Sequence, residues 1–394
     1  MPPRPQGQLF PPPELKPRSR VLVMGVGGAG CNSVARMLSR WPEGPPAVAV
    51  NSDADALMSC GVPKTLLIGE RTTRGLGAAG DPAAGRLCVE ESLAALQDVM
   101  GGTDLLILVG GLGRGTGTGA LPLIAKAARD LGVVTLAFVS LPFSIEGDRC
   151  CRLADEGLRQ LRRFTGAVVA QPNDRLLKIA GASEALEDSF AASDAMIAEG
   201  VYALWYLLTN TGVINITLAD IQELADRSGG ALSFAYAEAA GPARVASALR
   251  GLLDSPLLEH GRLLSDAQGV LVNIAGGPDL TLADLQGIMG QITASVRSNA
   301  HICMGALVDP TRRDRVTITL LASEAWAEER LENGAVEPAS RSEKARPGET
   351  PELPMDLRPP DRGAFTTSNP TLIRGEDLDI PTFSRRGVKL SFDR

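Results

Sequence analysis

Ten residues in the first third of the chain, GGLGRGTGTG at 110–119, contain six glycines and two threonines. An apolar run at 105–109 precedes them, and a helix-like stretch at 121–131 follows. Glycines in such numbers cannot pack a core, but their backbone N–H groups can surround an anion where a strand meets a helix N-terminus. The segment therefore predicts a phosphate-binding loop, to which the hydroxyls of Thr116 and Thr118 add donors.

A second glycine-rich segment, GVGGAG at 25–30, follows a predicted strand and opens a predicted helix. It satisfies the G-x-G-x-x-G pattern, and Asp53 ends the next strand, as in dinucleotide-binding proteins. A P-loop is excluded, because the chain contains no Gly-Lys dipeptide. Two glycine loops that converge on one site fit a nucleoside triphosphate better than a dinucleotide. A nicotinamide-dependent oxidoreductase remains a remote alternative.

The composition excludes several other classes of protein. The net charge of −7 argues against a nucleic-acid partner, which would favour a basic surface. The sequence contains no stretch of 18 apolar residues that would predict a transmembrane anchor. Its proline-rich start does not resemble a signal peptide. Six scattered cysteines and two histidines predict no metal site made by the protein alone. We expect a cytoplasmic protein with reduced thiols.

Apolar runs alternate with helical stretches in an order that predicts an α/β fold with a parallel sheet covered on both faces. Strands are expected at 21–24, 47–50, 105–109, 133–139 and 167–170, and later at 269–275, 301–307 and 315–321. One long helix is expected near 184–208 and another at 281–298. The predicted regions are a disordered N-terminal tail at 1–19, a nucleotide-binding domain at 20–182, a central helix at 183–208, a C-terminal domain at 209–325, a flexible linker at 326–374 and a tail peptide at 375–394.

The Gly-Thr-Gly-Thr-Gly core at 115–119 resembles the signature of the tubulin/FtsZ superfamily of polymerising GTPases. Further segments resemble that family in the same order, namely VLVMGVGGAGCNSVARM at 21–37, VNSDA at 50–54, RGLGA at 74–78, PFSIEG at 142–147, PNDRLLK at 172–178, SPLL at 255–258 and DIPTF at 379–383. The resemblance implies a Rossmann-like GTP-binding domain, a long central helix and a smaller C-terminal α/β domain. It also implies a bacterial cell-division protein that assembles head to tail into a ring at midcell.

The resemblance implies which residues hold GTP or GDP. Phosphate and ribose contacts fall on Gly28, Ala29, Gly30, Cys31, Asn32, the loop 78–81, Gly115, Thr116, Gly117 and Glu146, and guanine contacts on Asn173, Phe190 and Asp194. A carboxylate suits guanine, because it accepts from the N1–H and 2-amino donors. Mg²⁺ is expected to be held mainly by phosphate oxygens and water.

In this family a loop after the long helix of one subunit completes the pocket of the next and orients the attacking water. Here that loop is 211–220, with Asn215 and Asp220 as candidate catalytic residues. Thr217 stands where the family usually has a further acid. Cys150 replaces a nucleotide-contacting arginine, although Arg149 and Arg152 lie close by, and Arg114 replaces a glycine. We therefore expect slower hydrolysis, and a non-hydrolysing GTP-bound filament scaffold is the alternative.

The end of the chain resembles the peptide by which the family binds membrane-tethering and regulatory division proteins. Asp379, Ile380, Pro381 and Phe383 are the residues that would carry this contact. Basic residues follow at Arg385, Arg386, Lys389 and Arg394, which would favour an acidic surface. The sequence therefore predicts two kinds of partner, other copies of the chain and tail-binding division proteins.

Overall fold

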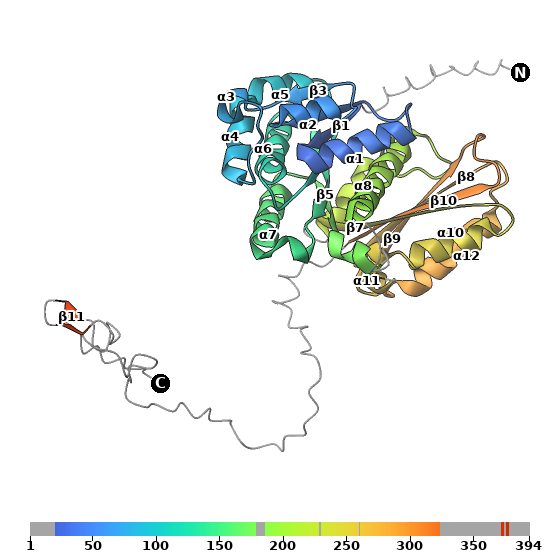
Figure 1. The fold of residues 1–394 in the computed structure, drawn as a ribbon. Helices are drawn as coiled ribbons and strands as arrows, with labels where there is room; N and C mark the ends of the chain where they lie inside the picture. Colours follow the sequence, from blue (N-terminus) through green and yellow to red (C-terminus); the bar gives the residue numbers. More distant parts are fainter. Residues whose placement is uncertain are drawn as a thin grey trace, which may run out of the picture. The chain divides into compact units, whose positions relative to one another are not determined.

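The computed structural model (Figure 1) describes residues 20–178, 186–227, 230–259 and 261–323, together with 372–373 and 376–377. Contacts divide the chain into two units, residues 1–336 and 337–394. In the second unit, β11 (Leu372–Ile373) pairs with β12 (Glu376–Asp377) in antiparallel fashion. The predicted tail at 1–19 and the DIPTF peptide lie outside the described residues, as does the predicted linker apart from 372–373.

The first unit is built on one ten-stranded sheet with the order β3-β2-β1-β4-β5-β6-β7-β10-β8-β9. Its first seven strands run parallel, and the inner ones are mostly apolar because helices cover both of their faces. These strands are β1 (Val21–Val26), β2 (Ala47–Asn51), β3 (Thr65–Leu67), β4 (Leu105–Gly111), β5 (Val134–Leu141), β6 (Ala167–Pro172) and β7 (Ala231–Ala240). The order around β1 and β4 is that of a doubly wound fold, whose ligands bind where the strand order reverses.

Two layers of helices enclose the parallel part of the sheet. One face packs against α1 (Gly27–Arg40), α2 (Ala54–Ser59), α8 (Leu186–Thr209) and α9 (Leu218–Asp226). The other face packs against α4 (Pro82–Glu91), α5 (Leu93–Met100), α6 (Thr116–Asp130) and α7 (Asp148–Arg162), and the short α3 (Glu70–Thr73) lies beside α4. The expected α/β fold with a covered parallel sheet is therefore confirmed.

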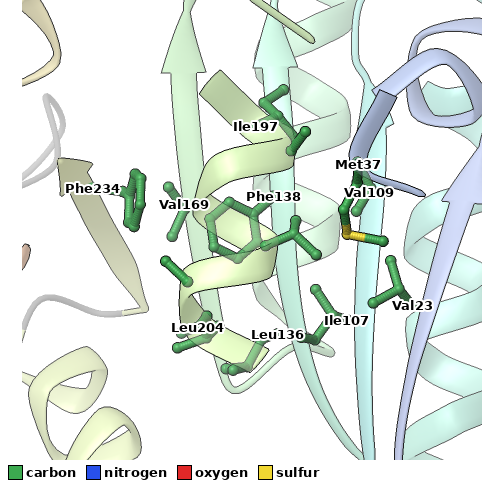
Figure 2. Close-up of a cluster of buried hydrophobic side chains, with 14 of the residues drawn as sticks. Val23, Met37, Ile107, Val109, Leu136, Phe138, Val169, Ile197, Leu204 and Phe234 are labelled. Carbon is green, nitrogen blue, oxygen red and sulfur yellow. The ribbon is translucent and has the colours of Figure 1, made fainter. Parts of the chain in front are cut away.

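Helix α8 is the long central helix that apolar residues on more than one of its faces predict. Figure 2 shows Ile197 and Leu204 of this helix against Phe138 of β5 and Val169 of β6, with Phe234 of β7 beside them. All five side chains are buried. The helix thus packs along β5, β6 and β7, the last three parallel strands of the sheet.

The C-terminal part of the sheet is mixed. Strand β10 (Arg315–Ser323) pairs antiparallel with both β7 and β8 (Gly269–Gly276), and β8 pairs parallel with β9 (His301–Val308). Strand β7 joins these strands to β6 through only two residue pairs, Val168 with Ala231 and Val169 with Leu232. Helices α10 (Arg244–Leu253) and α12 (Leu282–Ser295) contribute to the core beside it, as does α11 (Arg262–Asp266).

An aromatic stack joins α1 to α8 and to the C-terminal part. Trp41, after α1, stacks on Tyr202 of α8 with ring centroids 4.1 Å apart. Tyr202 stacks on Tyr206 at 5.9 Å, and the guanidinium of Arg312 lies 4.5 Å from the Tyr206 ring. The Tyr206 hydroxyl donates to Asp309, between β9 and β10. Among the described helices, none is both long and apolar enough to span a membrane.

Candidate functional site

A crevice of about 420 Å³ lies at the carboxyl ends of the parallel strands, where the strand order reverses between β1 and β4. Helix α1 begins directly after β1, and α6 begins five residues after β4, so both helix N-termini face this place. The first N–H groups of a helix lack intrahelical partners and favour anions. The crevice therefore has the architecture of a phosphate site.

Both glycine-rich loops line the crevice, and their backbones come close to each other. Gly27 has a φ of +72°, which side-chain-bearing residues rarely adopt, and a Cβ on it would lie 3.2 Å from the N of Gly117. A Cβ on Gly117 would lie 2.1 Å from the carbonyl oxygen of Gly111. The glycines here are therefore required by close backbone approach, as the phosphate-loop prediction implies.

Helix α6 starts earlier than the sequence suggests. It begins at Thr116 rather than near Leu121, so Gly117 and Gly119 lie inside its first turn. Thr116 lines the crevice, with its hydroxyl 2.7 Å from that of Ser52. Thr118 is buried, and its hydroxyl accepts from the N–H of Gly113 at 2.9 Å. Thr118 therefore stabilises the loop from within. Because Thr118 does not line the crevice, its expected role as a hydroxyl donor to the ligand is corrected.

The first loop divides into residues that face the crevice and residues that do not. Gly28 and Ala29 line it. A Cβ on Gly30 would lie 2.2 Å from the carbonyl oxygen of Val109, so Gly30 permits α1 to pack on β4. The Cys31 thiol is buried, and burial raises its pKa to about 12. Asn32 is exposed and lies outside the crevice lining.

Three acidic side chains and one basic side chain line the crevice among the described residues, namely Asp53, Glu146, Asp194 and Arg114. Glu146 ends a short 3₁₀ helix, η1 (Ser144–Glu146), and its Oε1 accepts from the N–H of Phe143 at 3.0 Å. Its Oε2 lies 3.0 Å from Nη2 of Arg114. Asp53 caps α2 by accepting from the N–H of Ala56 at 2.9 Å, which gives its carboxylate a structural role.

Cys150 lies behind this rim rather than in the crevice. Its Sγ is 3.2 Å from the carbonyl oxygen of Gly113, and it lines a neighbouring hollow that Arg114 and Glu146 share. Burial, followed by the nearby charge of Glu146, raises the pKa of the Cys150 thiol. The thiol therefore packs against the second glycine loop from outside.

The far end of the crevice is formed by the start of α8 and the end of β6. Phe190 is 38% exposed and meets the buried Phe143 edge-on, with centroids 5.1 Å apart. Asn173 is buried, and its Oδ1 accepts from the Ser193 hydroxyl at 2.8 Å, which in turn accepts from Gln171 at 3.0 Å. This network holds the Asn173 carboxamide in one orientation, so it offers fixed polar groups beside an aromatic face.

Asp194 lies at this same end, one turn after Phe190. Burial raises the pKa of its carboxyl to about 6. The hydrogen bond from the Ser33 hydroxyl at 2.9 Å and the charge of Arg36 both act to lower this pKa, but burial has the larger effect. A carboxylate that is costly to ionise when alone gains most from a ligand that donates hydrogen bonds to it. The position thus suits a group with paired N–H donors.

The loop 211–220 follows the opposite end of α8. Its backbone pairs with β9 through Ile214 and Ala306, and Asn215 Oδ1 accepts from the N–H of Gly212 at 2.7 Å. Thr217 caps α9, and Asp220 Oδ2 accepts from both the N–H and the hydroxyl of Thr217 at 2.7 Å. Asn215, Thr217 and Asp220 therefore lie together on one loop, and none of them lines the crevice.

Several crevice residues carried no assignment from the sequence pattern. Asn51, Leu76, Ser140, Pro142 and Ser193 also line it. Asn51 and Ser140 end or nearly end strands next to the glycine loops, so their position at the carboxyl edge of the sheet was the available signal. Ser193 carries no such signal, because only the packing of α8 turns it inward.

Comparison with known proteins gives the family. Residues 20–181 match the family described as "Tubulin/FtsZ family, GTPase domain", and residues 230–325 match "FtsZ family, C-terminal domain". The cell division protein FtsZ of Wigglesworthia glossinidia brevipalpis is 36% identical over 315 residues, which are 80% of this chain and 82% of that protein.

Solved structures agree with this match. An FtsZ dimer from M. jannaschii, described as empty, superposes with a TM-score of 0.70 at 32% identity, over 78% of this chain and 89% of that one. The GDP-bound monomer of CetZ1 from Haloferax volcanii gives a TM-score of 0.67 at 22% identity, over 80% and 97%, which shows the shared fold. Because both family domains match in order along the chain, and the first of them contains the glycine-loop crevice, the chain belongs to the FtsZ family of tubulin-like GTPases.

Proposed function

We propose that this chain binds GTP in the crevice with the phosphates on the two glycine loops and guanine at the Asp194 end. We further propose that hydrolysis occurs only where the loop 211–220 of a second copy meets those phosphates. The observation that carries the proposal is the joint lining of one crevice by both glycine loops, Phe190 and Asp194. The GTPase activity itself is that of the family.

The phosphate end of the proposal rests on backbone groups. Gly28 and Ala29 lie at the start of α1, and Gly115, Thr116 and Gly117 lie at the start of α6, all in the crevice lining. A Cβ on Gly28 would meet nothing within 4 Å, so open space lies beside it. Two helix N-termini aimed at the same space would stabilise a chain of phosphates without needing a P-loop lysine.

Gly30, Cys31 and Asn32 take a different part in this proposal. They follow the ligand-facing residues. Gly30 and Cys31 hold α1 against the sheet through close packing and a buried thiol, whereas Asn32 is exposed. We assign them a supporting role, because none of the three lines the crevice. Cys150 likewise supports the second loop from outside the crevice.

The guanine end rests on complementary hydrogen bonds. The Asp194 carboxylate would accept from N1–H and the 2-amino group of guanine, whereas adenine offers an acceptor at N1. The fixed Asn173 carboxamide would contact the same base, and the exposed part of Phe190 would stack on it. A site whose acceptors match the donors of guanine rejects a base without those donors, because the polar groups of the site would be left unpaired. Glu146 would accept from the ribose hydroxyls.

The proposed shared site follows from the length of α8. Fifteen residues separate Asp194 from Thr209, which at 1.5 Å per residue is roughly 22 Å along the helix. The loop then pairs with β9, six strands beyond β4 in the sheet, or roughly 29 Å at ~4.8 Å per strand. Asp220 therefore cannot reach the phosphates of its own chain. A head-to-tail neighbour would bring it there.

The loop surface fits such a neighbour. Val213 is 76% exposed and Ile214 is 41% exposed, so apolar side chains face solvent beside Asn215 and Asp220. In the proposed contact these side chains would pack on the next subunit while Asn215 positions water and Asp220 polarises it. Thr217, in place of a further acid, would leave this chemistry slower than a pair of carboxylates would.

The metal and the tail complete the proposal. Among the described residues, no three acidic, histidine or cysteine side chains are placed to hold a metal ion, so Mg²⁺ would be held through phosphate oxygens and water. The peptide with Asp379, Ile380, Pro381 and Phe383 would bind membrane-tethering division proteins at midcell. Deleting residues 375–394 should then abolish partner binding and spare polymerisation.

The test is phosphate release from GTP with Mg²⁺ as a function of protein concentration. A site made by two subunits predicts turnover near zero at low concentration and a rise above a threshold. Turnover proportional to concentration throughout would contradict the shared site. Bound GTP with no turnover at any concentration would replace the proposal with a static GTP-bound filament.

A further inference from the structure

The crevice has an unusual charge balance for a triphosphate site. Its described lining contains three carboxylates, on Asp53, Glu146 and Asp194, against the single guanidinium of Arg114. A bound nucleoside triphosphate would add about four negative charges, and developing charge on phosphates requires cationic compensation. Backbone N–H groups supply partial positive charge only, and the proposed Mg²⁺ would offset only part of the phosphate charge. The placement of Arg114 therefore matters for the remaining charge.

Arg114 lies on the border between two spaces. It lines both the crevice and the neighbouring hollow of about 350 Å³, which Arg149 and Cys150 also line. Its side chain is 78% exposed, whereas that of its partner Glu146 is 15% exposed. The guanidinium is therefore free to move, while the carboxylate is held in place by the N–H of Phe143.

The backbone that carries Arg114 is anchored on both sides. Gly113 has a φ of +107° and lies against Cys150, whose Sγ is 3.2 Å from its carbonyl oxygen. The N–H of Gly113 is held by Thr118, and a Cβ on Gly115 would lie 2.8 Å from that of Ala78. The backbone of Arg114 is therefore fixed at the crevice rim, and only its side chain changes position.

We propose that Arg114 is the phosphate-binding cation of this chain and that it changes partners when nucleotide binds. Its guanidinium leaves Glu146 and binds the phosphate chain, which frees the Glu146 carboxylate to accept from the ribose hydroxyls. This inference rests on the proposed GTP site and adds a residue whose contribution grows with the number of phosphates. No covalent bond changes in this exchange.

The relative strengths of the two contacts favour the exchange. An ion pair with one highly exposed partner contributes at most about fivefold to an equilibrium constant. Charge-assisted hydrogen bonds from arginine to a phosphate contribute about tenfold to a hundredfold, and they are frequently bidentate. Glu146 loses one partner but regains hydroxyl donors, so the carboxylate is not left unpaired.

The first experiment compares Arg114→Gln with wild type by titrating guanosine, GMP, GDP and GTP in turn. We expect little change for guanosine and a loss that increases along the series to about tenfold to a hundredfold for GTP. Arg149→Gln is the matched control, because Arg149 lines only the neighbouring hollow, and we expect it to bind GTP as wild type does. Arg114→Lys should recover part of the loss, since it keeps the charge without the planar fork.

The second experiment uses inorganic tripolyphosphate, which has neither ribose nor base. Glu146→Gln should increase tripolyphosphate affinity by up to about fivefold, because the competing ion pair is gone. In the Arg114→Gln background the same substitution should have no such effect. A decrease or an unchanged affinity in Glu146→Gln would show that Arg114 is not held back by Glu146.

The outcomes separate this inference from the proposed function. If wild type fails to bind GTP, the proposed site is wrong. If wild type binds GTP and Arg114→Gln weakens guanosine as much as GTP, Arg114 only maintains the loop and the inference is overturned. If the variant keeps full affinity for every nucleotide but polymerises poorly, Arg114 contacts a neighbouring subunit and the inference is again overturned.

Discussion

The side chains at the two ends of α8 differ in how fully the chain itself buries them and supplies their hydrogen-bond partners. At its start, Ser193 and Asp194 face inward and are bonded to Asn173 and Ser33 in a half-enclosed crevice. At its end, the helix leads to a loop whose Val213 faces solvent. In the proposed function, one subunit would therefore contain the groups that bind GTP, and the loop 211–220 of a second subunit would supply the groups that hydrolyse it.

The largest effect is expected from Asp220→Ala. Turnover should fall about 10²- to 10³-fold, because a water-polarising carboxylate is lost, while GTP affinity stays unchanged because Asp220 is outside its own crevice. Phosphate release and nucleotide titration measure the two quantities. A drop in affinity equal to the drop in turnover would contradict the separation of the two ends of α8.

The chain provides a matched control for this variant. Thr281 and Asp284 form the same capping arrangement at the start of α12, with Asp284 Oδ2 accepting from the N–H of Thr281 at 2.9 Å. Asp284→Ala should cost the same stability, about 1 kcal/mol, and leave turnover unchanged. Equal losses of turnover in both variants would assign the effect of Asp220→Ala to helix stability.

Asp194→Asn tests the other end of α8. GTP affinity should fall about 10²-fold, because the amide N–H₂ opposes the donors of guanine. The free protein should become more stable by up to about 3 kcal/mol above pH 6, since burial raises the pKa of this carboxyl to about 6 and ionisation is therefore costly. Isothermal titration measures the loss of GTP affinity, and thermal unfolding measures the gain in stability. The control is Asp188→Asn, on the exposed side of α8.

Mixing these two variants tests whether the site is shared. Asp220→Ala keeps a competent crevice, and Asp194→Asn keeps a competent loop. An equal mixture should hydrolyse GTP faster than the sum of the separate proteins, because some interfaces then combine the two intact parts. A mixture no faster than that sum would contradict a site made by two chains.

A smaller effect is expected from pH. In the proposed site Asp194 would bind guanine as the carboxylate, so affinity should fall about tenfold per pH unit below its pKa of about 6. The stability contribution has the opposite sign, since a raised pKa favours the protonated folded state; it is present at low pH and is lost as the pH rises through about 6. The ratio of wild-type to Asp194→Asn affinity cancels the titration of the phosphates. A ratio that does not vary between pH 5 and 7 would contradict the assignment.

The smallest effect is expected from Thr217→Asp. Aspartate caps a helix as well as threonine does, so α9 should keep its start, while a second carboxylate near Asp220 should increase turnover several-fold. Thr281→Asp at the matching position is the control, and its turnover should not change. An unchanged or lower rate in Thr217→Asp would refute the idea that Thr217 slows hydrolysis.

The fold was largely predictable because its signals are local. Apolar runs such as 105–109 are buried strands, and the glycine loops mark the two helix starts at the carboxyl edge of the sheet. β3 and β7 were not expected. β3 is three residues long, and the alanine-rich β7 has little β-propensity and is determined by pairing with β6 and β10. The start of α6 at Thr116 was missed because six glycines and a proline weaken helix propensity between 110 and 122.

The segments that form the candidate site could be predicted from the sequence, but which of their residues face the crevice could not. Thr116 and Thr118 are equivalent in the sequence, yet one hydroxyl faces the crevice and the other bonds Gly113. Gly28 and Gly30 belong to one motif, yet only Gly28 lines the crevice. Rotation by 100° per residue around a helix start decides these differences, and pattern spacing alone does not contain it.

The sequence by itself determined the class of ligand and the family, because glycine-rich backbone loops and the order of the motifs are local properties of the chain. The tertiary structure alone decided that Asp194 is costly to ionise, since desolvation depends on what packs around it. It likewise decided that Arg114 faces Glu146, which is 32 residues away in the chain. Most of all, the length of α8 and the width of the sheet separate the loop 211–220 from the crevice, and only distances in three dimensions can require a second subunit.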